Sequence, residues 1–249
     1  ASASRVGCQA PAAGVAGGPR PHAMGIVYCI TVSSCRDLGD YRRAAEWTEA
    51  ANRWCDKLDV TGFPGACRVH RAEVMRLRGD WPAAEAQAQA ACDELEDFDR
   101  FISAGGYYEI GEIRRQRGDF AGAQESYRTS DELGRDPQPG LALLRLGEGN
   151  VGAAVAGITR SLADTTEPLI RLRRLPAQVE IALAAGDLAT ARAALEELEQ
   201  IVDSYRIGGR RTLAFDATIQ LATGRIKLAE KDFEGAAESL QKSRDSWRE

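Results

Sequence analysis

Apolar residues recur at spacings of three and four along most of the chain, which is the pattern of amphipathic α-helices. In the stretch that begins at Tyr41, for example, Ala44, Ala45 and Ala51 fall on the same helix face as Tyr41, and charged residues occupy the rest. Similar stripes run through residues 103–117, 120–133, 188–201 and 233–247. No segment of useful length alternates between apolar and polar residues as a strand would. The pattern therefore predicts an all-α protein.

A short turn motif recurs six times between these helices. It consists of Gly-Asp or a close variant, an aromatic or aliphatic residue, two variable residues and Ala. Gly can end a helix in a left-handed conformation at little cost, and Asp or Asn can cap the next helix. Ala four positions after the cap allows two antiparallel helices to approach closely. The copies begin at Gly39, Gly79, Gly118, Gly149, Gly186 and Lys231.

The spacing of the motif indicates a repeat protein. Successive Asp or Asn positions are separated by 31 to 45 residues. The shortest interval runs from Asp119 to Asn150, and the longest runs from Asp187 to Asp232. This spacing predicts about six helix hairpins, which resemble tetratricopeptide (TPR) repeats and imply a right-handed α-solenoid over residues 22–249. The fourth hairpin should begin with a helix of only about eight residues. Residues 1–21, rich in Ala, Gly, Ser and Pro, are expected to be a disordered or expression-derived lead-in.

Seven stretches carry a more specific resemblance: 25–29 (GIVYC), 43–48 (RAAEWT), 53–56 (RWCD), 69–73 (VHRAE), 108–112 (YEIGE), 136–144 (DPQPGLALL) and 175–181 (LPAQVEI). Over roughly residues 24–249 the chain resembles the helical-repeat region of bacterial transcriptional regulators with a LuxR-type helix-turn-helix. That resemblance implies a cytoplasmic module that senses a ligand or partner and relays this to a DNA-binding domain. No phosphate-binding G-x-x-x-x-G-K-[ST] loop and no basic recognition helix occur, so we expect no direct nucleic-acid binding by this segment.

Composition narrows the function further. With 32 Lys and Arg against 37 Asp and Glu, the net charge is −5, which does not favour a nucleic-acid-binding face. No stretch approaches the ~20 apolar residues of a membrane span, so no membrane contact is expected. The two histidines, and the lack of G-x-S-x-G and H-E-x-x-H motifs, give no basis for catalysis. We expect a protein without enzyme activity and without a cofactor.

The six cysteines include no C-x-x-C pair. In a chain long enough to form its own core, they are expected to be buried, reduced thiols rather than a disulfide framework. Cys67 and His70 supply only two of the four ligands of a structural zinc site, so no metal site is expected.

One candidate binding site follows from the repeat geometry. In tetratricopeptide arrays the first helix of each hairpin lines a concave groove, which residues four and seven positions before the turn Asp should face. Arginines and carboxylates in such a row can bind a peptide through charge-assisted hydrogen bonds. The alternative is that Glu73–Arg76 and Glu112–Arg115 are ordinary i,i+3 pairs on a solvated helix face. The candidate residues at these positions are Arg36, Glu73, Arg76, Glu112 and Arg115, and Tyr108 joins them because it lies one turn before Glu112.

These observations favour a non-enzymatic module that binds a protein, a peptide or another ligand in its groove. The resemblance implies that this module is the sensing region of a bacterial transcriptional regulator. The alternative is a structural scaffold that forms a homodimer through its terminal hairpin, where the apolar face of residues 233–247 lacks a following helix. In that case Leu240→Asp should break the dimer. A hydrolase or transferase would instead require a deep cleft with several perturbed carboxylates.

Overall fold

The computed structural model describes residues 21–58, 63–95, 99–206, 209 and 211–248. Within these residues the chain forms twelve α-helices and no strand, which confirms the all-α prediction. The predicted lead-in lies outside the described residues, except for Pro21, the first residue of the first helix. The helices are α1 Pro21–Asp37, α2 Tyr41–Leu58, α3 Phe63–Leu77, α4 Trp81–Leu95, α5 Arg100–Gln116, α6 Phe120–Glu132, α7 Gly140–Gly147, α8 Val151–Ala163, α9 Pro168–Ala184, α10 Leu188–Ser204, α11 Leu213–Ala229 and α12 Phe233–Arg248.

Consecutive helices pair into six hairpins, and each hairpin packs against the next. This is the α-solenoid that the turn motif predicted. The fourth hairpin begins with α7, which has only 8 residues, as its sequence indicated. None of the described helices combines the length and the apolar character that crossing a membrane requires.

The turns have the geometry that the motif predicted. The turn glycines have positive φ angles, such as 69° at Gly39, and Lys231 adopts φ 68° where the motif lacks glycine. The next residue caps the following helix: the Asp119 side chain accepts a hydrogen bond from the Gly122 N–H, and Asn150 accepts one from the Ala153 N–H. The alanines four positions after the caps are buried at every hairpin contact: Ala44, Ala84, Ala123, Ala154, Ala191 and Ala236.

The cysteines that the structure describes are thiols and do not form disulfides. Cys67 and Cys92 are buried, and Cys29 and Cys35 are half-buried. Cys8 and the side chain of Cys55 lie outside the described part of the structure.

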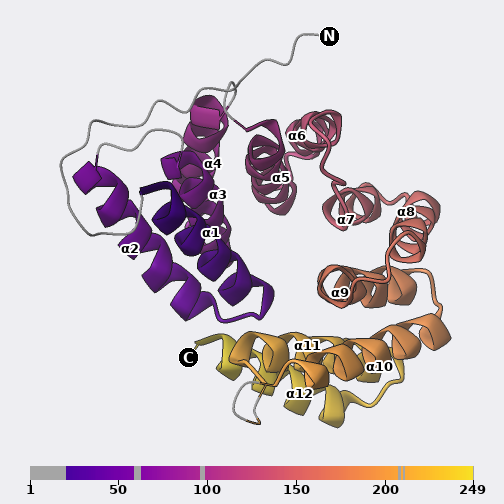
Figure 1. Cartoon of the computed structure of the whole chain (residues 1–249). Helices are drawn as coiled ribbons and strands as arrows, with labels where there is room; N and C mark the ends of the chain where they lie inside the picture. The colour runs from indigo at the N-terminus through magenta and orange to yellow at the C-terminus, as the bar shows by residue number, and fades with distance from the viewer. Residues whose placement is uncertain (1–20, 59–62, 96–98, 207–208, 210, 249) are drawn as a thin grey trace.

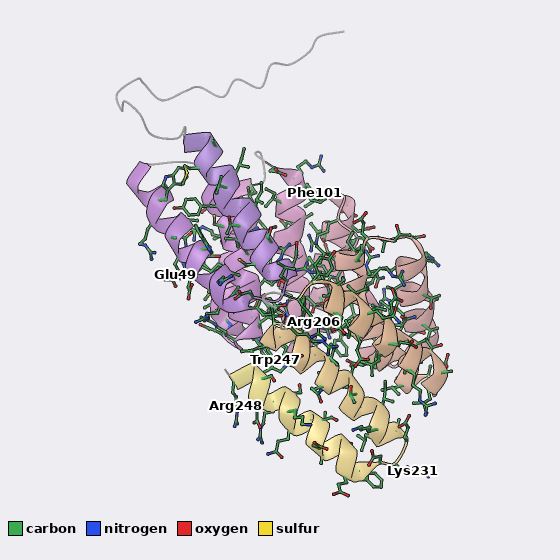
Figure 2. All side chains as sticks on the ribbon, turned by 60° about the horizontal axis from the view of Figure 1, so that its bottom comes forward. Glu49, Phe101, Arg206, Lys231, Trp247 and Arg248 are labelled. Carbon is green, nitrogen blue, oxygen red and sulfur yellow. The ribbon has the colours of Figure 1, made fainter. Side chains whose placement is uncertain are left out.

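The hairpins curve around a central space until the last one meets the first (Figure 1). In the view of Figure 1, α1, α5, α7, α9 and α11 lie on the inner side of this ring, and α2, α6, α8 and α12 lie on the outer side. At the junction, the Thr212 hydroxyl donates a hydrogen bond to the Leu38 carbonyl over 3.0 Å. Trp247, near the end of α12 (Figure 2), stacks on Tyr41 with ring centroids 6.4 Å apart. The solenoid therefore forms an almost closed ring.

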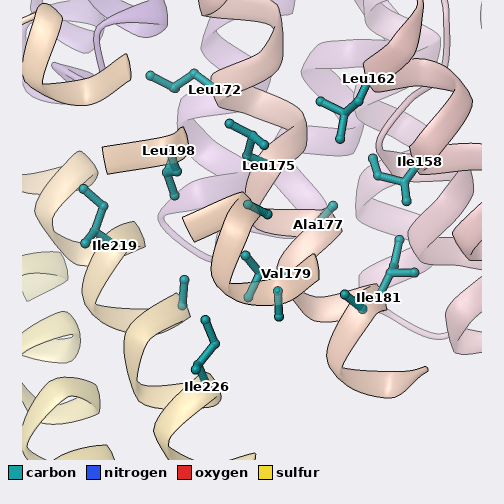
Figure 3. Close-up of a cluster of buried hydrophobic side chains, with 14 of the residues drawn as sticks. Ile158, Leu162, Leu172, Leu175, Ala177, Val179, Ile181, Leu198, Ile219 and Ile226 are labelled. Atoms are coloured by element: carbon teal, nitrogen blue, oxygen red, sulfur yellow. The ribbon is translucent and has the colours of Figure 1, made fainter. Parts of the chain in front are cut away.

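The two halves of the ring have different interiors. From α7 to α11 the helices share a large apolar cluster that includes Leu175, Leu198 and Ile219 (Figure 3). The apolar clusters between α3 and α7 are smaller. The first half instead buries three carboxylates, those of Glu73, Glu109 and Glu112. Among the described residues, the buried carboxylates therefore all lie in the first half of the chain.

Candidate functional site

The inner side of the ring contains a cavity of about 570 Å³. Its wall comes chiefly from α1, α3, α5, α9, α11 and the segment between α6 and α7. Five of the six predicted groove residues line it, although they come from three different hairpins: Arg36, Glu73, Arg76, Tyr108 and Glu112. The sixth, Arg115, does not line the cavity but binds Glu112.

Glu73 connects three helices. Arg36 of α1 lies 3.5 Å from its carboxylate, and Arg173 of α9 donates a hydrogen bond to it over 3.1 Å. The Arg173 guanidinium also lies 3.4 Å from the Asp37 carboxylate. Burial raises the pKa of Glu73, but the charges of Arg173, Arg36 and Arg76 outweigh burial and lower this pKa to about 2. Glu73 is therefore ionised at neutral pH.

His70 lies beside this group on α3. Because a guanidinium can only donate, Arg36 Nη1 donates to His70 Nδ1 over 3.1 Å. Burial and the charge of Arg36 lower the pKa of His70 to about 4, against the opposing charges of Glu73 and Asp37. The imidazole is consequently neutral at pH 7, with its proton on Nε2.

Arg76 binds the next hairpin rather than its own helix. Its Nε donates to the Glu109 carboxylate over 2.8 Å, and both side chains are almost fully buried. Burial raises the pKa of Glu109, and the charge of Arg76 offsets this only in part. The alternative prediction of an i,i+3 pair between Glu73 and Arg76 is therefore wrong, because each of these residues pairs with a residue of another helix. Glu109 was absent from the predicted set, although it lies one turn before Glu112 on α5 and lines the same cavity.

Glu112 forms the third buried pair. It accepts hydrogen bonds from Arg115 over 2.8 Å and from the Tyr127 hydroxyl over 2.6 Å. The predicted i,i+3 pair with Arg115 is thus present, but it lies in a buried site rather than on a solvated helix face. Burial raises the pKa of Glu112, and the charges of Arg115 and Arg76, with hydrogen bonds from Arg115 and Tyr127, lower it overall.

The Tyr108 ring contacts a cationic side chain. The Arg135 guanidinium, from the segment between α6 and α7, lies 4.9 Å from the centre of the Tyr108 ring. Burial raises the pKa of Tyr108, so its hydroxyl stays protonated. Asp136, which follows Arg135 in the chain, accepts a hydrogen bond from Arg174 of α9 over 2.7 Å. Neither Arg135 nor Arg173 was predicted, because both reach the cavity from parts of the chain outside the turn-based rule.

Three buried carboxylates with shifted pKa values line one cavity, a feature that a hydrolase or transferase would require. Each of them, however, is bound by at least one arginine: Glu73, Glu109 and Glu112. Ion-pair networks that are purely structural shift pKa values in the same way. Among the described residues, no three His, Cys, Asp or Glu side chains gather closely enough to hold a metal ion. The geometry therefore favours a rigid polar wall over a set of reacting groups.

Comparison with known proteins supports the fold. No protein-family model matches the chain, and no curated protein matches its sequence. The crystal structure of BtubC (BKLC) from P. vanneervenii is similar with a TM-score of 0.50 and 13% identity, covering 92% of this chain and 91% of that chain. A tetratricopeptide repeat protein from Parabacteroides merdae gives a TM-score of 0.43 and 16% identity, covering 90% and 93%. The likeness to BtubC extends over the whole fold of the described helices, and the tetratricopeptide-like character comes from the hairpins and turns described above.

Proposed function

We propose that this chain is a protein-binding module that holds a peptide segment of its partner inside the ring. The observation that carries the proposal is that five of the six predicted groove residues, from three hairpins, line one cavity. Its volume of about 570 Å³ lies within the roughly 300–1,000 Å³ of typical ligand sites. A peptide fits this wall better than an apolar ligand does, because the wall presents both charged and aromatic groups.

The ion pairs of the wall are suited to this role because they are already formed without a ligand. Arg76 is held by Glu109, and Arg36 is held by Asp37 and His70. A guanidinium has five N–H donors, so an arginine fixed by one carboxylate can also donate to peptide oxygens. Groups that are fixed in advance lose little conformational entropy when a peptide binds.

The test begins with a peptide selected from a random display library against the whole chain. Its affinity is then measured by fluorescence anisotropy for the variant Arg76→Gln with Glu109→Gln, which keeps polar side chains but removes both charges. We expect binding at least about tenfold weaker, since charge-assisted hydrogen bonds contribute about 1.5–3 kcal/mol each.

The matched control is Arg192→Gln with Glu230→Gln. This pair also joins two neighbouring hairpins, but it lies outside the cavity. It should leave affinity unchanged, and circular dichroism should show equal helix content in all three proteins. Unchanged affinity in the cavity variant, or a library that yields no binder, would contradict the proposal.

The regulatory role is a further part of the proposal and rests on the resemblance to LuxR-type regulators. We propose that peptide binding in the ring controls the output of a bacterial transcriptional regulator. A reporter-gene assay on the full reading frame tests this. The cavity variant Arg76→Gln with Glu109→Gln should lose the response to the peptide, and an unaltered response would refute the regulatory link.

A scaffold that pairs through its last hairpin is the second candidate. Its supporting observation is that Leu228 and Phe233, at the turn between α11 and α12, are 51% and 66% exposed. Along the rest of α12, Ser239 and Ser243 are buried, whereas Trp247 stacks on Tyr41 and is still 45% exposed. Of the apolar face expected to be uncovered over residues 233–247, Phe233, Ala237 and Trp247 are exposed, and Ala236 and Leu240 are covered at least in part.

Leu240→Asp is not a suitable test of this pairing. Leu240 is half-buried against α11, where a Cβ at Gly224 would lie only 2.7 Å from its Cγ. A charge there would disrupt the hairpin itself. Leu228→Ser with Phe233→Ser is the better variant, measured by light scattering after size-exclusion chromatography. A wild-type dimer that becomes a monomer in this variant would favour the scaffold.

A further inference from the structure

One arginine of the cavity wall has no acidic partner among the described residues. Arg135 contacts the Tyr108 ring, and its buried Nε has no hydrogen-bond partner. The other arginines of the wall each pair with a carboxylate: Arg36, Arg76, Arg173 and Arg174. Arg135 is therefore the arginine of the described wall that has no carboxylate within ion-pair distance.

Two exposed apolar side chains on different helices are linked to this arginine through their neighbours. Phe101 lies one turn before Gly105 on α5, and a Cβ at Gly105 would lie 3.9 Å from Arg135 Nη1. Ile170 lies one turn before Arg174 on α9, and Arg174 binds Asp136, the residue after Arg135. Phe101, at the start of α5 (Figure 2), is 64% exposed, and Ile170 is 41% exposed. Both side chains line the same cavity as Arg135.

We propose that Arg135, Phe101 and Ile170 form a subsite for an acidic side chain of the bound peptide that has apolar residues on both sides. This inference rests on the proposed peptide-binding function. The carboxylate would accept hydrogen bonds from the terminal N–H groups of the Arg135 guanidinium, and apolar peptide side chains would cover Phe101 and Ile170. A peptide's terminal carboxylate fits less well, because peptide residues precede it but none follow it.

The stacking of Arg135 on Tyr108 does not by itself explain the arrangement. A guanidinium stacked on an aromatic ring is stabilised where its flat face meets the ring. The N–H donors at the edge of the guanidinium still need acceptors. A carboxylate in the cavity would supply the acceptor that the terminal N–H groups lack among the described carboxylates. Stacking also holds the guanidinium plane in place, which favours two parallel hydrogen bonds to one carboxylate.

The experiment uses the whole chain and short fluorescein-labelled peptides blocked at both ends. In an extended peptide, residues two apart point to the same side and are separated by roughly 6.6 Å. The test peptide therefore contains Leu-Ser-Glu-Ser-Leu. Companion peptides replace Glu by Gln, replace both Leu by Ser, or end in Leu with a free carboxylate. Affinities are measured by fluorescence anisotropy.

We expect the Glu peptide to bind at least about tenfold more tightly than the Gln peptide, as a charge-assisted hydrogen bond predicts. Arg135→Gln should remove that preference, and Arg135→Lys should restore part of it. The control Arg128→Gln removes an exposed arginine of α6 that pairs with Glu125 outside the cavity, and it should change nothing. Circular dichroism checks that each variant is folded.

Four results would overturn the inference: equal affinity for the Glu and Gln peptides, no effect of Arg135→Gln, preference for the free carboxylate, or no binding of the Glu peptide. The proposed function has a separate readout. If a display-selected peptide still depends on Arg76 and Glu109 while Arg135→Gln has no effect, peptide binding stands and only the acidic subsite is rejected.

Discussion

The Arg173 guanidinium of α9 lies 3.1 Å from the Glu73 carboxylate of α3, although the two residues are 100 positions apart in the chain. Extensive helix–helix contacts among the described residues join only helices of the same or adjacent hairpins. The ring is closed instead by a few contacts, which we call the seam: Arg173 with Glu73 and Asp37, Thr212 with Leu38, and Tyr41 with Trp247. A seam with so few contacts should open more easily than the stacked hairpins separate.

Replacing Arg173 by Gln should weaken the seam. Glu73 would keep Arg36 but lose its partner on α9, at a cost of about 1–3 kcal/mol in the free energy of unfolding. Small-angle X-ray scattering should show a larger radius of gyration, and urea denaturation should show the lower stability. Arg171→Gln is the control, because Arg171 pairs with Glu197 inside its own hairpin. Equal radii for the two variants would show that Arg173 does not hold the ring closed.

Two turn glycines provide a second test of the seam. Gly39 and Gly79 both have positive φ, so Ala costs about 1–2 kcal/mol at either position. A Cβ at Gly79 would meet no atom within 4 Å, but a Cβ at Gly39 would lie 3.0 Å from Thr212 Oγ1 and 3.1 Å from the Phe215 ring. Only Gly39→Ala should therefore enlarge the ring in solution scattering. If both variants keep the wild-type radius, the close approach of Gly39 is unimportant for closure.

The pKa of His70 predicts a pH dependence of stability. An unfolded histidine titrates near pH 6.5, whereas burial and Arg36 lower the pKa of His70 in the folded chain to about 4. Between these values the unfolded state binds more protons, so stability should fall as the pH decreases from about 6.5 to about 4.

The protein loses stability as the pH falls from 7 to 5, and His70→Gln should reduce this loss in the free energy of unfolding by about 1–2 kcal/mol. Urea denaturation of both proteins at the two pH values measures the difference. Glu73, Asp37 and Arg173 also face His70, and they remain in the variant. Glu109, whose raised pKa acts in the opposite direction, is likewise common to both proteins. Identical pH dependence would mean that His70 titrates normally in the folded chain.

Two glycines inside helices should respond to Ala with opposite signs. In α8, a Cβ at Gly157 would make only ordinary contacts, so Gly157→Ala should stabilise the protein by about 0.5–1 kcal/mol. In α5, a Cβ at Gly111 would lie 2.6 Å from the ring of the buried Tyr127. Gly111→Ala should therefore destabilise by about 1–3 kcal/mol. Thermal or urea denaturation gives both values, and a stabilising Gly111→Ala would be incompatible with this packing.

The groove residues could be predicted because their positions depend on a local rule. The turn at Asp80 fixes the phase of α3, and the 3.6-residue period then places Glu73 and Arg76 on the inner face. Their partners could not be predicted in this way. Arg76 binds Glu109 because α3 and α5 are adjacent in the stack, and the sequence provides the spacing of hairpins but not the offset between them.

The sequence by itself determined the helices, the turns and the face that each inner helix presents, because periodicity, capping and glycine conformation act over a few residues. Only the tertiary structure decided that the solenoid closes, that Arg173 meets Glu73, and that Arg135 reaches the cavity without an acidic partner among the described residues. Those outcomes depend on small rotations between successive hairpins that accumulate over the whole stack. A change of a few degrees at each contact would separate α9 from α3, although no local pattern in the sequence would differ.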